Sequence, residues 1–224
     1  MKIFILFLIF SLFTSEINAQ TGELIGSVNL PTISKKKRTF RGRVYRNRLA
    51  GKAENSQEDK SVTSFENVIV SAHPISFKSK VKPLKENVKV LQKNKEFIPK
   101  VVAVTKGSTI EFINNDNFYH NVFSLKSGDK FNIGRRPTGE VVKRKIETSG
   151  EIKIFCDIHS QMSAVILSFE TPYFTNLEAD GKFNLDLPKG KYEIQIYHSS
   201  LPLFKETIEI KANQKLEKNF TLSN

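Results

Sequence analysis

The stretch Phe155-Cys156-Asp157-Ile158-His159-Ser160-Gln161-Met162 decides what the surrounding fold has to hold in place. It contains the single cysteine of the 224-residue chain, and a histidine and a methionine follow that cysteine at three-residue intervals. Upstream, Ile152 and Ile154 share one face with the cysteine, which predicts a short strand that ends there. A tight loop after this strand can turn the thiolate, the imidazole and the thioether to one point.

A second histidine follows another predicted strand, in the Asn-rich stretch from Asn114 to Phe123. One thiolate, two imidazoles and one thioether are the ligand set of a mononuclear blue (type 1) copper site. The thiolate gives strong electronic coupling outward, and the weak thioether helps to set the potential. A stiff β frame that keeps these ligands in place lowers the barrier to moving one electron. The candidate ligands of this single copper ion are His120, Cys156, His159 and Met162.

Other interpretations of these residues have to be weighed. Zinc would accept the cysteine and both histidines but gains little from a methionine. A nucleophilic Cys–His pair also has this short spacing, but it would need an orienting group and an oxyanion hole, which the sequence does not locate. Taken singly, Cys156 or Met162 would be an ordinary core residue. The joint pattern favours copper, and a carrier of electrons over an enzyme.

The rest of the chain is predicted to be all-β. Apolar and polar residues alternate over short runs that turn residues interrupt, and no segment has the pattern of a long amphipathic helix. The lone cysteine excludes a disulfide framework and any cluster that needs four thiolates. The predicted strands lie at residues 100–104, 109–113, 152–156, 164–169, 182–187, 191–197, 207–210 and 220–222.

Residues from about Asn87 to Phe169 resemble the cupredoxins, the blue copper proteins of the amicyanin and plastocyanin type. The motifs that carry the resemblance are the turn and strand at Val104–Ile110, the triplet His120–Val122 and the stretch Phe155–Met162. The resemblance implies a Greek-key β-sandwich with copper at one end. It also implies the ligand roles, with His120, Cys156 and His159 equatorial and Met162 axial.

Two further positions matter in this resemblance. Asn121 matches the family's supporting asparagine, whose hydrogen bonds tie the two ligand loops together and whose backbone N–H faces the thiolate. Asp157 and Ile158 stand where relatives often have a small polar residue and a proline. An acid beside the cysteine would affect the potential, whereas the ligand set itself is intact.

The flanks resemble a carboxypeptidase-regulatory-like (transthyretin-like) β-sandwich. Residues 179–183 and 188–192 match the Asp-Gly-x-Phe and Pro-x-Gly-x-Tyr turns of that family. We therefore expect a second, small sandwich with the cupredoxin inserted into one of its loops. The predicted division is a signal peptide at 1–19, the first outer strands at 20–80 with a basic insertion at 35–64, the cupredoxin at 86–169, and the remaining outer strands at 170–224.

The N-terminus predicts export. One cation, Lys2, precedes a short apolar run, and Ala19 offers a small residue for cleavage, as in a secretory signal peptide. The apolar run is shorter than the roughly 20 residues that span a bilayer. The mature protein is therefore expected in the periplasm or outside the cell, without a membrane span, and nucleic acid is not an expected partner.

The positive charge is concentrated in one segment. Lys and Arg total 35 and Asp and Glu total 23, so the net charge is 35 − 23 = +12. Eight cations and no acids lie between residues 35 and 48, which leaves 12 − 8 = +4 for the remainder. This run could dock an acidic partner or an anionic envelope surface, or it could be a solvated insertion. Its candidate docking residues are Lys35, Lys36, Lys37, Arg38, Arg41, Arg43, Arg46 and Arg48.

Three functions fit these features. The leading hypothesis is an exported type 1 copper protein that carries single electrons between redox partners, with His159 as the exit. The second is a copper-binding or copper-delivery protein that exchanges metal with a donor or acceptor without redox cycling. The third is a cell-envelope interaction module in which copper is incidental.

Overall fold

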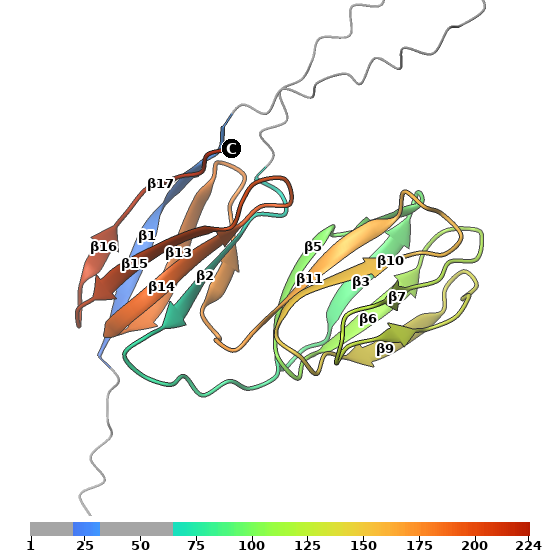
Figure 1. The fold of residues 1–224 in the computed structure, drawn as a ribbon, viewed down its shortest axis with the longest axis horizontal. Helices are drawn as coiled ribbons and strands as arrows, with labels where there is room; N and C mark the ends of the chain where they lie inside the picture. Colours follow the sequence, from blue (N-terminus) through green and yellow to red (C-terminus); the bar gives the residue numbers. More distant parts are fainter. Residues whose placement is uncertain (1–19, 32–64) are drawn as a thin grey trace, which may run out of the picture.

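A computed structural model describes residues 20–31 and 65–224, which form seventeen β-strands and no helix. The all-β prediction is therefore confirmed. The predicted signal peptide at 1–19 and the basic run at 35–48 lie outside the described residues. The strands form four sheets, arranged as two β-sandwiches that lie side by side (Figure 1). Within the described ranges, no helix is long and apolar enough to cross a membrane.

The central sandwich is built from residues 88–169 and has two sheets. The first sheet has the order β4 (Glu96–Ile98), β3 (Val88–Lys93), β6 (Thr109–Asn114) and β9 (Val141–Lys145). The second has the order β5 (Val101–Thr105), β11 (Ser163–Phe169), β10 (Gly150–Phe155), β7 (Phe123–Ser124) and β8 (Phe131–Asn132).

The flanking sandwich joins strands from both sides of the central one. Its first sheet has β1 (Thr21–Asn29) between β13 (Lys182–Pro188) and β16 (Lys215–Glu217), and β17 (Phe220–Thr221) also pairs with β1. Its second sheet has the order β12 (Phe174–Asn176), β2 (Ile69–Pro74), β14 (Gly190–Tyr197) and β15 (Phe204–Ile210). Strands that precede and follow the central sandwich in sequence thus pair directly.

Each sandwich buries its own core because apolar residues alternate along the strands. In β13 and β14 every second residue is buried, which gives the flanking core. The central core includes Ile152 and Ile154 of β10, and it extends without a break to Cys156 and Met162. The loop that carries the candidate ligands is therefore anchored in the core of the central sandwich.

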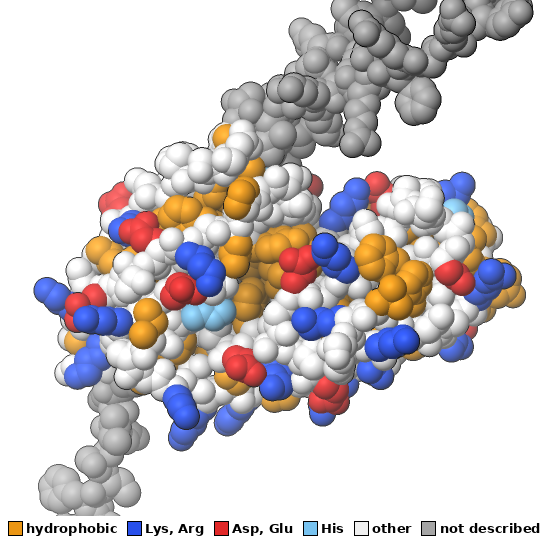
Figure 2. All heavy atoms as spheres, in the orientation of Figure 1, with side chains coloured by type: hydrophobic (Ala, Val, Ile, Leu, Met, Phe, Trp, Pro, Cys, Tyr) orange, Lys and Arg blue, Asp and Glu red, His pale blue; other side chains and the backbone are white. Residues whose placement is uncertain are grey.

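Strand β11 is buried on both faces, which explains its nearly continuous apolar sequence. Ala164 and Ile166 face the central core. Leu167 and Phe169 belong to a separate apolar cluster at the junction, together with Ile69 of β2 and the partly buried Phe174 and Tyr197. Hydrophobic side chains are visible between the two lobes of the molecule in Figure 2. This cluster packs the two sandwiches against each other.

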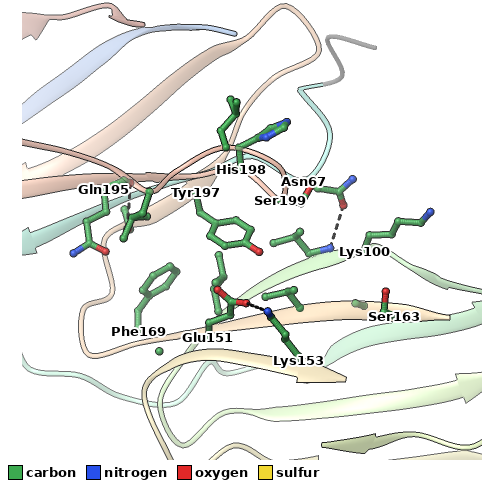
Figure 3. A pocket seen from close by; sticks show the side chains of 18 of the residues that line it. Asn67, Lys100, Glu151, Lys153, Ser163, Phe169, Gln195, Tyr197, His198 and Ser199 are labelled. Carbon is green, nitrogen blue, oxygen red and sulfur yellow. Dashed lines mark hydrogen bonds and ion pairs between the residues drawn. The ribbon is translucent and has the colours of Figure 1, made fainter. Parts of the chain in front are cut away.

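A cleft of about 690 Å³ runs along the same junction (Figure 3). Tyr197 and Phe169 line it, and the ion pair of Lys153 with Glu151 crosses part of its edge at 3.5 Å. Burial and, to a smaller extent, the charge of the nearby Glu151 raise the pKa of Tyr197 to about 12. The described residues that line this cleft include none of the four candidate copper ligands.

Candidate metal centre

Three of the four candidate ligands converge at one end of the central sandwich. One ligand atom from each of His120, Cys156 and His159 lies within 4.8 Å of the others. The Sγ atom of Cys156 is 3.9 Å from Nδ1 of His120, and the two imidazole centroids are 4.9 Å apart. Met162 is buried in the same core cluster as Cys156, with 1% of its surface exposed. In the described part of the chain, no other group of three or more histidine, cysteine, aspartate or glutamate side chains lies close enough together to hold a metal ion.

The loop after β10 is closed by its own backbone. The N–H of Met162 donates to the carbonyl of His159 at 2.9 Å, and the N–H of Cys156 donates to the carbonyl of Met162 at 3.3 Å. These two hydrogen bonds fold the loop back on itself between β10 and β11. The three-residue spacing therefore places Cys156, His159 and Met162 on one short, closed loop.

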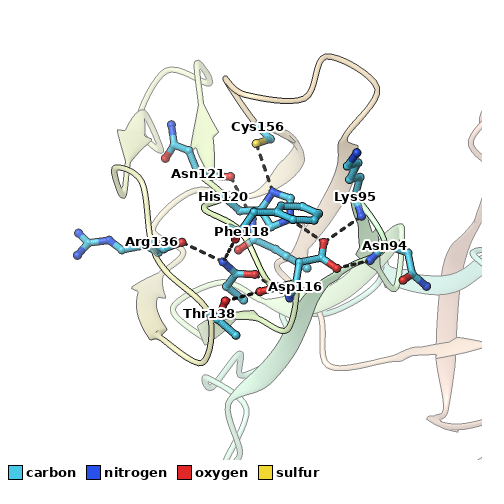
Figure 4. Close-up of polar contacts among 11 residues, drawn as sticks. Asn94, Lys95, Asp116, Phe118, His120, Asn121, Arg136, Thr138 and Cys156 are labelled. Carbon is cyan, nitrogen blue, oxygen red and sulfur yellow. Dashed lines mark hydrogen bonds and ion pairs between the residues drawn. The ribbon is translucent and has the colours of Figure 1, made fainter.

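His120 is fixed by a second, Asn-rich loop (Figure 4). Its backbone pairs with Arg136, with N–H to carbonyl distances of 3.1 and 2.6 Å. The amide of the buried Asn114 donates to the carbonyls of Phe118 and Arg136, at 2.8 and 2.9 Å. The Asn114 side chain thus replaces backbone pairs that this irregular loop does not make.

Asp116 is the partner of His120 on the side away from the cysteine. Its Oδ2 atom lies 2.7 Å from Nε2 of His120, and both side chains are buried. The same carboxylate accepts the backbone N–H groups of Asn94 and Lys95, at 2.7 and 3.0 Å. Asn94 and Lys95 have φ angles of 55° and 58°, so this turn adopts a left-handed backbone that brings both N–H groups to one carboxylate.

Electrostatics determine the tautomer of His120. Burial by itself raises the pKa of Asp116, but hydrogen bonds from Lys95, His120 and Asn94 outweigh it, so the pKa lies below its ordinary value. The carboxylate is therefore ionised and Nε2 of His120 carries the proton. With the proton on Nε2, the nitrogen that offers a lone pair to a metal ion is Nδ1, which faces Sγ of Cys156.

His159 completes the fit to a metal ion. Its Nδ1 atom is buried and has no hydrogen-bond partner among the described residues. Burial lowers the pKa of His159, and the charges of His120 and Lys95 lower it further while Asp116 raises it. A buried polar atom without a partner is energetically costly. Binding of a metal ion by Nδ1 of His159 would supply that partner. These donors fit copper by number, type and closeness.

Asn121 is buried beside His120, with 1% of its surface exposed. Its Oδ1 atom has no partner among the described residues, and its backbone carbonyl accepts a hydrogen bond from Gln92 at 3.1 Å. The expected tie through the asparagine side chain is thus not made by Oδ1. Gln92, itself buried in β3, instead links the His120 loop to the first sheet of the central sandwich.

Three residues of this site were not singled out from the sequence. Asp116 could have been found from the sequence, because it is an acidic residue four positions before His120 in the same Asn-rich loop. Phe118 packs edge-on or tilted against both histidines, with its ring centroid 5.1 Å from that of His120 and 5.5 Å from that of His159. Lys95 lies over the Phe118 ring at 5.4 Å, and it comes from a turn distant in sequence that no local pattern connects to the ligands.

Comparison with known proteins agrees with this geometry. The model of the family described as copper binding proteins, plastocyanin/azurin family, matches residues 84–168. The plastocyanin of Ulva prolifera is 32% identical over 77 residues, which cover 29% of this chain and 74% of the relative. The plastocyanin of Ulva pertusa is 30% identical over the same length, with the same coverage.

Solved structures of cupredoxins are also similar to part of this chain. Amicyanin from Paracoccus versutus is 15% identical, with a TM-score of 0.35, and the match covers 46% of this chain and 99% of that one. A purple cupredoxin from Nitrosopumilus maritimus is 19% identical, with a TM-score of 0.34, and the match covers 37% of this chain and 100% of that one.

Proposed function

Because the chain belongs to the plastocyanin/azurin family of copper-binding proteins, we propose that it carries single electrons between redox partners outside the cytoplasm. The observation that supports this most strongly is the convergence of three donor atoms within 4.8 Å on two loops that hydrogen bonds hold in place. A site already assembled by the fold needs little rearrangement when the oxidation state changes.

We assign the ligand roles as follows. Cys156 is the thiolate anchor, His120 and His159 bind through Nδ1, and Met162 is the weak axial ligand. Bound copper supplies a one-electron couple at this point. Asp116 holds His120 in the correct tautomer, and the core packing of Cys156 and Met162 keeps water from the thiolate and the thioether. Asn121 is assigned a supporting role next to His120.

Burial favours electron transfer over copper delivery. Delivery requires an acceptor to reach the metal and replace ligands one by one. Cys156 is 5% exposed and Met162 is 1% exposed, whereas His159 is partly exposed. An electron can leave through the partly exposed His159, whereas the buried cysteine offers little surface to an incoming thiol. Burial of the ligands therefore favours electron transfer over exchange of copper with another protein as the main activity.

Cys156→Ser tests this function directly. The purified full chain loaded with Cu(II) is expected to have an intense visible thiolate-to-copper band and reversible one-electron voltammetry. The serine variant is expected to lose the band completely, because a hydroxyl does not replace the thiolate as a ligand for copper. The exposed Ser160→Ala in the same loop should keep it. A colourless wild-type protein, or a band that survives in the serine variant, would rule out a type 1 site.

The domain division and the location complete the proposal. Pairing of β1 with β13 and of β2 with β14 supports a discontinuous flanking sandwich, formed by residues 20–80 and 170–224, with the cupredoxin at 86–169 inserted between them. The N-terminal sequence supports export and cleavage near Ala19, which N-terminal sequencing of the secreted protein would test.

A further inference from the structure

An apolar patch surrounds the exposed edge of His159. Phe118, Tyr119 and Ile158 expose 39%, 57% and 38% of their surfaces. Phe118 lies between the two histidines, and Tyr119 and Ile158 are the residues immediately before His120 and His159. Large exposed apolar side chains that cluster in this way mark contact sites, whereas isolated ones do not. We call Phe118, Tyr119, Ile158 and His159 the exit patch.

Cations border the exit patch. The Nζ atom of Lys95 is 5.4 Å from the centroid of Phe118, and the described residues offer it no carboxylate partner. Arg135 is exposed and reaches Asp157 only at 3.9 Å. Asp116, the other acid here, is buried and hydrogen-bonded within the protein. Asp157 is itself 41% exposed and offsets Arg135, so the excess charge available to a partner at this end is positive and comes from Lys95.

We propose that the exit patch, with Lys95 and Arg135 at its border, docks an acidic redox protein, one with carboxylates around its own electron-transfer site. This inference rests on the proposed electron-carrier function and names the kind of partner. Charge complementarity selects the partner, since opposite charges speed up encounter and like charges suppress wrong pairs. The small apolar area suits a transient complex, as electron-transfer encounters usually are.

The first experiment measures anion binding without any copper. Hexacyanochromate(III), a redox-inert paramagnetic anion, is titrated into the isotopically labelled metal-free chain. We expect selective broadening of the amide signals of Lys95, Phe118 and Ile158. Lys95→Glu should reduce this broadening about fivefold at low salt. The matched control is Lys211→Glu, an exposed lysine in the flanking sandwich with the same change in net charge, and it should leave the broadening unchanged.

The second experiment measures electron transfer by the copper-loaded chain. Two electron donors to the copper-loaded chain are compared. One is a reduced plant-type [2Fe–2S] ferredoxin, which is acidic, and the other is ferrocytochrome c, which is basic. The ferredoxin should react faster at low salt, and salt should slow its reaction. Lys95→Glu should slow the ferredoxin reaction about fivefold and speed up the cytochrome reaction, while Lys211→Glu should change both little.

The outcomes separate the two proposals. Loss of electron transfer with both donors, together with normal anion binding, would contradict the electron-carrier function. Normal electron transfer with equal effects of Lys95→Glu and Lys211→Glu would overturn the docking proposal. Binding to phosphatidylglycerol vesicles that depends on Lys95, with an unchanged ferredoxin rate, would also overturn it, because the surface would then face a lipid.

Discussion

Asp116→Asn is expected to raise the reduction potential of the copper-loaded protein. The substitution removes a buried negative charge that lies 2.7 Å from Nε2 of His120. Loss of such a partner typically weakens metal binding about 10–100-fold. Cu(II) should lose more affinity than Cu(I), because the higher charge gains more from the carboxylate. Each tenfold difference between the two losses raises the potential by about 59 mV, which voltammetry and competition titrations measure.

A matched control separates this effect from simple loss of stability. Asp129 is also fully buried in the central sandwich, and it accepts the N–H groups of Glu147 and Thr148 at 2.9 and 2.7 Å, but no candidate ligand contacts it. Asp129→Asn and Asp116→Asn should each cost about 1–3 kcal/mol of unfolding free energy. Only Asp116→Asn should move the potential and, in the metal-free chain, the ¹⁵N shifts that report the His120 tautomer. Equal potentials in the two variants would contradict the role of Asp116.

Gly26→Ala is expected to destabilise the flanking sandwich strongly. A Cβ atom at Gly26 would meet the backbone carbonyl of Lys218, whose N–H also donates to Ile25 at 2.8 Å. Gly22, on the same face of β1, would place a Cβ 2.7 Å from the carbonyl of Lys211. Backbone atoms cannot rotate away as side chains can, so the chain that follows β15 would have to move. We expect a loss of about 3 kcal/mol, measured by thermal unfolding.

Ser27→Ala is the control for this prediction. Ser27 is the next residue of β1, and its hydroxyl donates to Asn219 at 2.9 Å on the exposed side. Losing this bond should cost about 1 kcal/mol. In Gly26→Ala the visible band of the copper-loaded protein should persist at temperatures below the unfolding transition, since the copper site lies in the other sandwich. A Gly26→Ala protein as stable as the wild type would show that the glycine face of β1 is not closely packed.

The sequence groups the candidate ligands more readily than it groups the residues that support them. Cys156, His159 and Met162 lie within seven residues, so a local pattern is enough to group them. Asp116 depends on the turn between β3 and β4, whose N–H groups reach it from 22 and 21 residues away. Such a contact arises only when two loops meet in space. For the same reason Lys95 could not be connected to Phe118 before the fold was known.

The apolar run in β11 illustrates a similar limit. Its composition predicts a buried strand, and the structure confirms the strand at Ser163–Phe169. The sequence does not say what covers the second face, which packs against Ile69 and Tyr197 of the flanking sandwich. The basic run at 35–48 dominates the charge of the sequence but lies outside the described residues, and the cations near the ligands are Lys95 and Arg135 instead.

The direction of the strands determines which end of the central sandwich stays accessible when the protein is immobilised on a surface. β3 and β6 run in parallel towards the metal end, with Val88 paired to Ile110 at the far end, and β11 runs away from the metal end and finishes at Phe169. Both covalent connections to the flanking sandwich therefore leave from the end opposite the ligands. If the flanking sandwich is attached to an electrode or a cell envelope, His159 lies at the end of the central sandwich away from the attachment. There it stays accessible to redox partners that diffuse in solution.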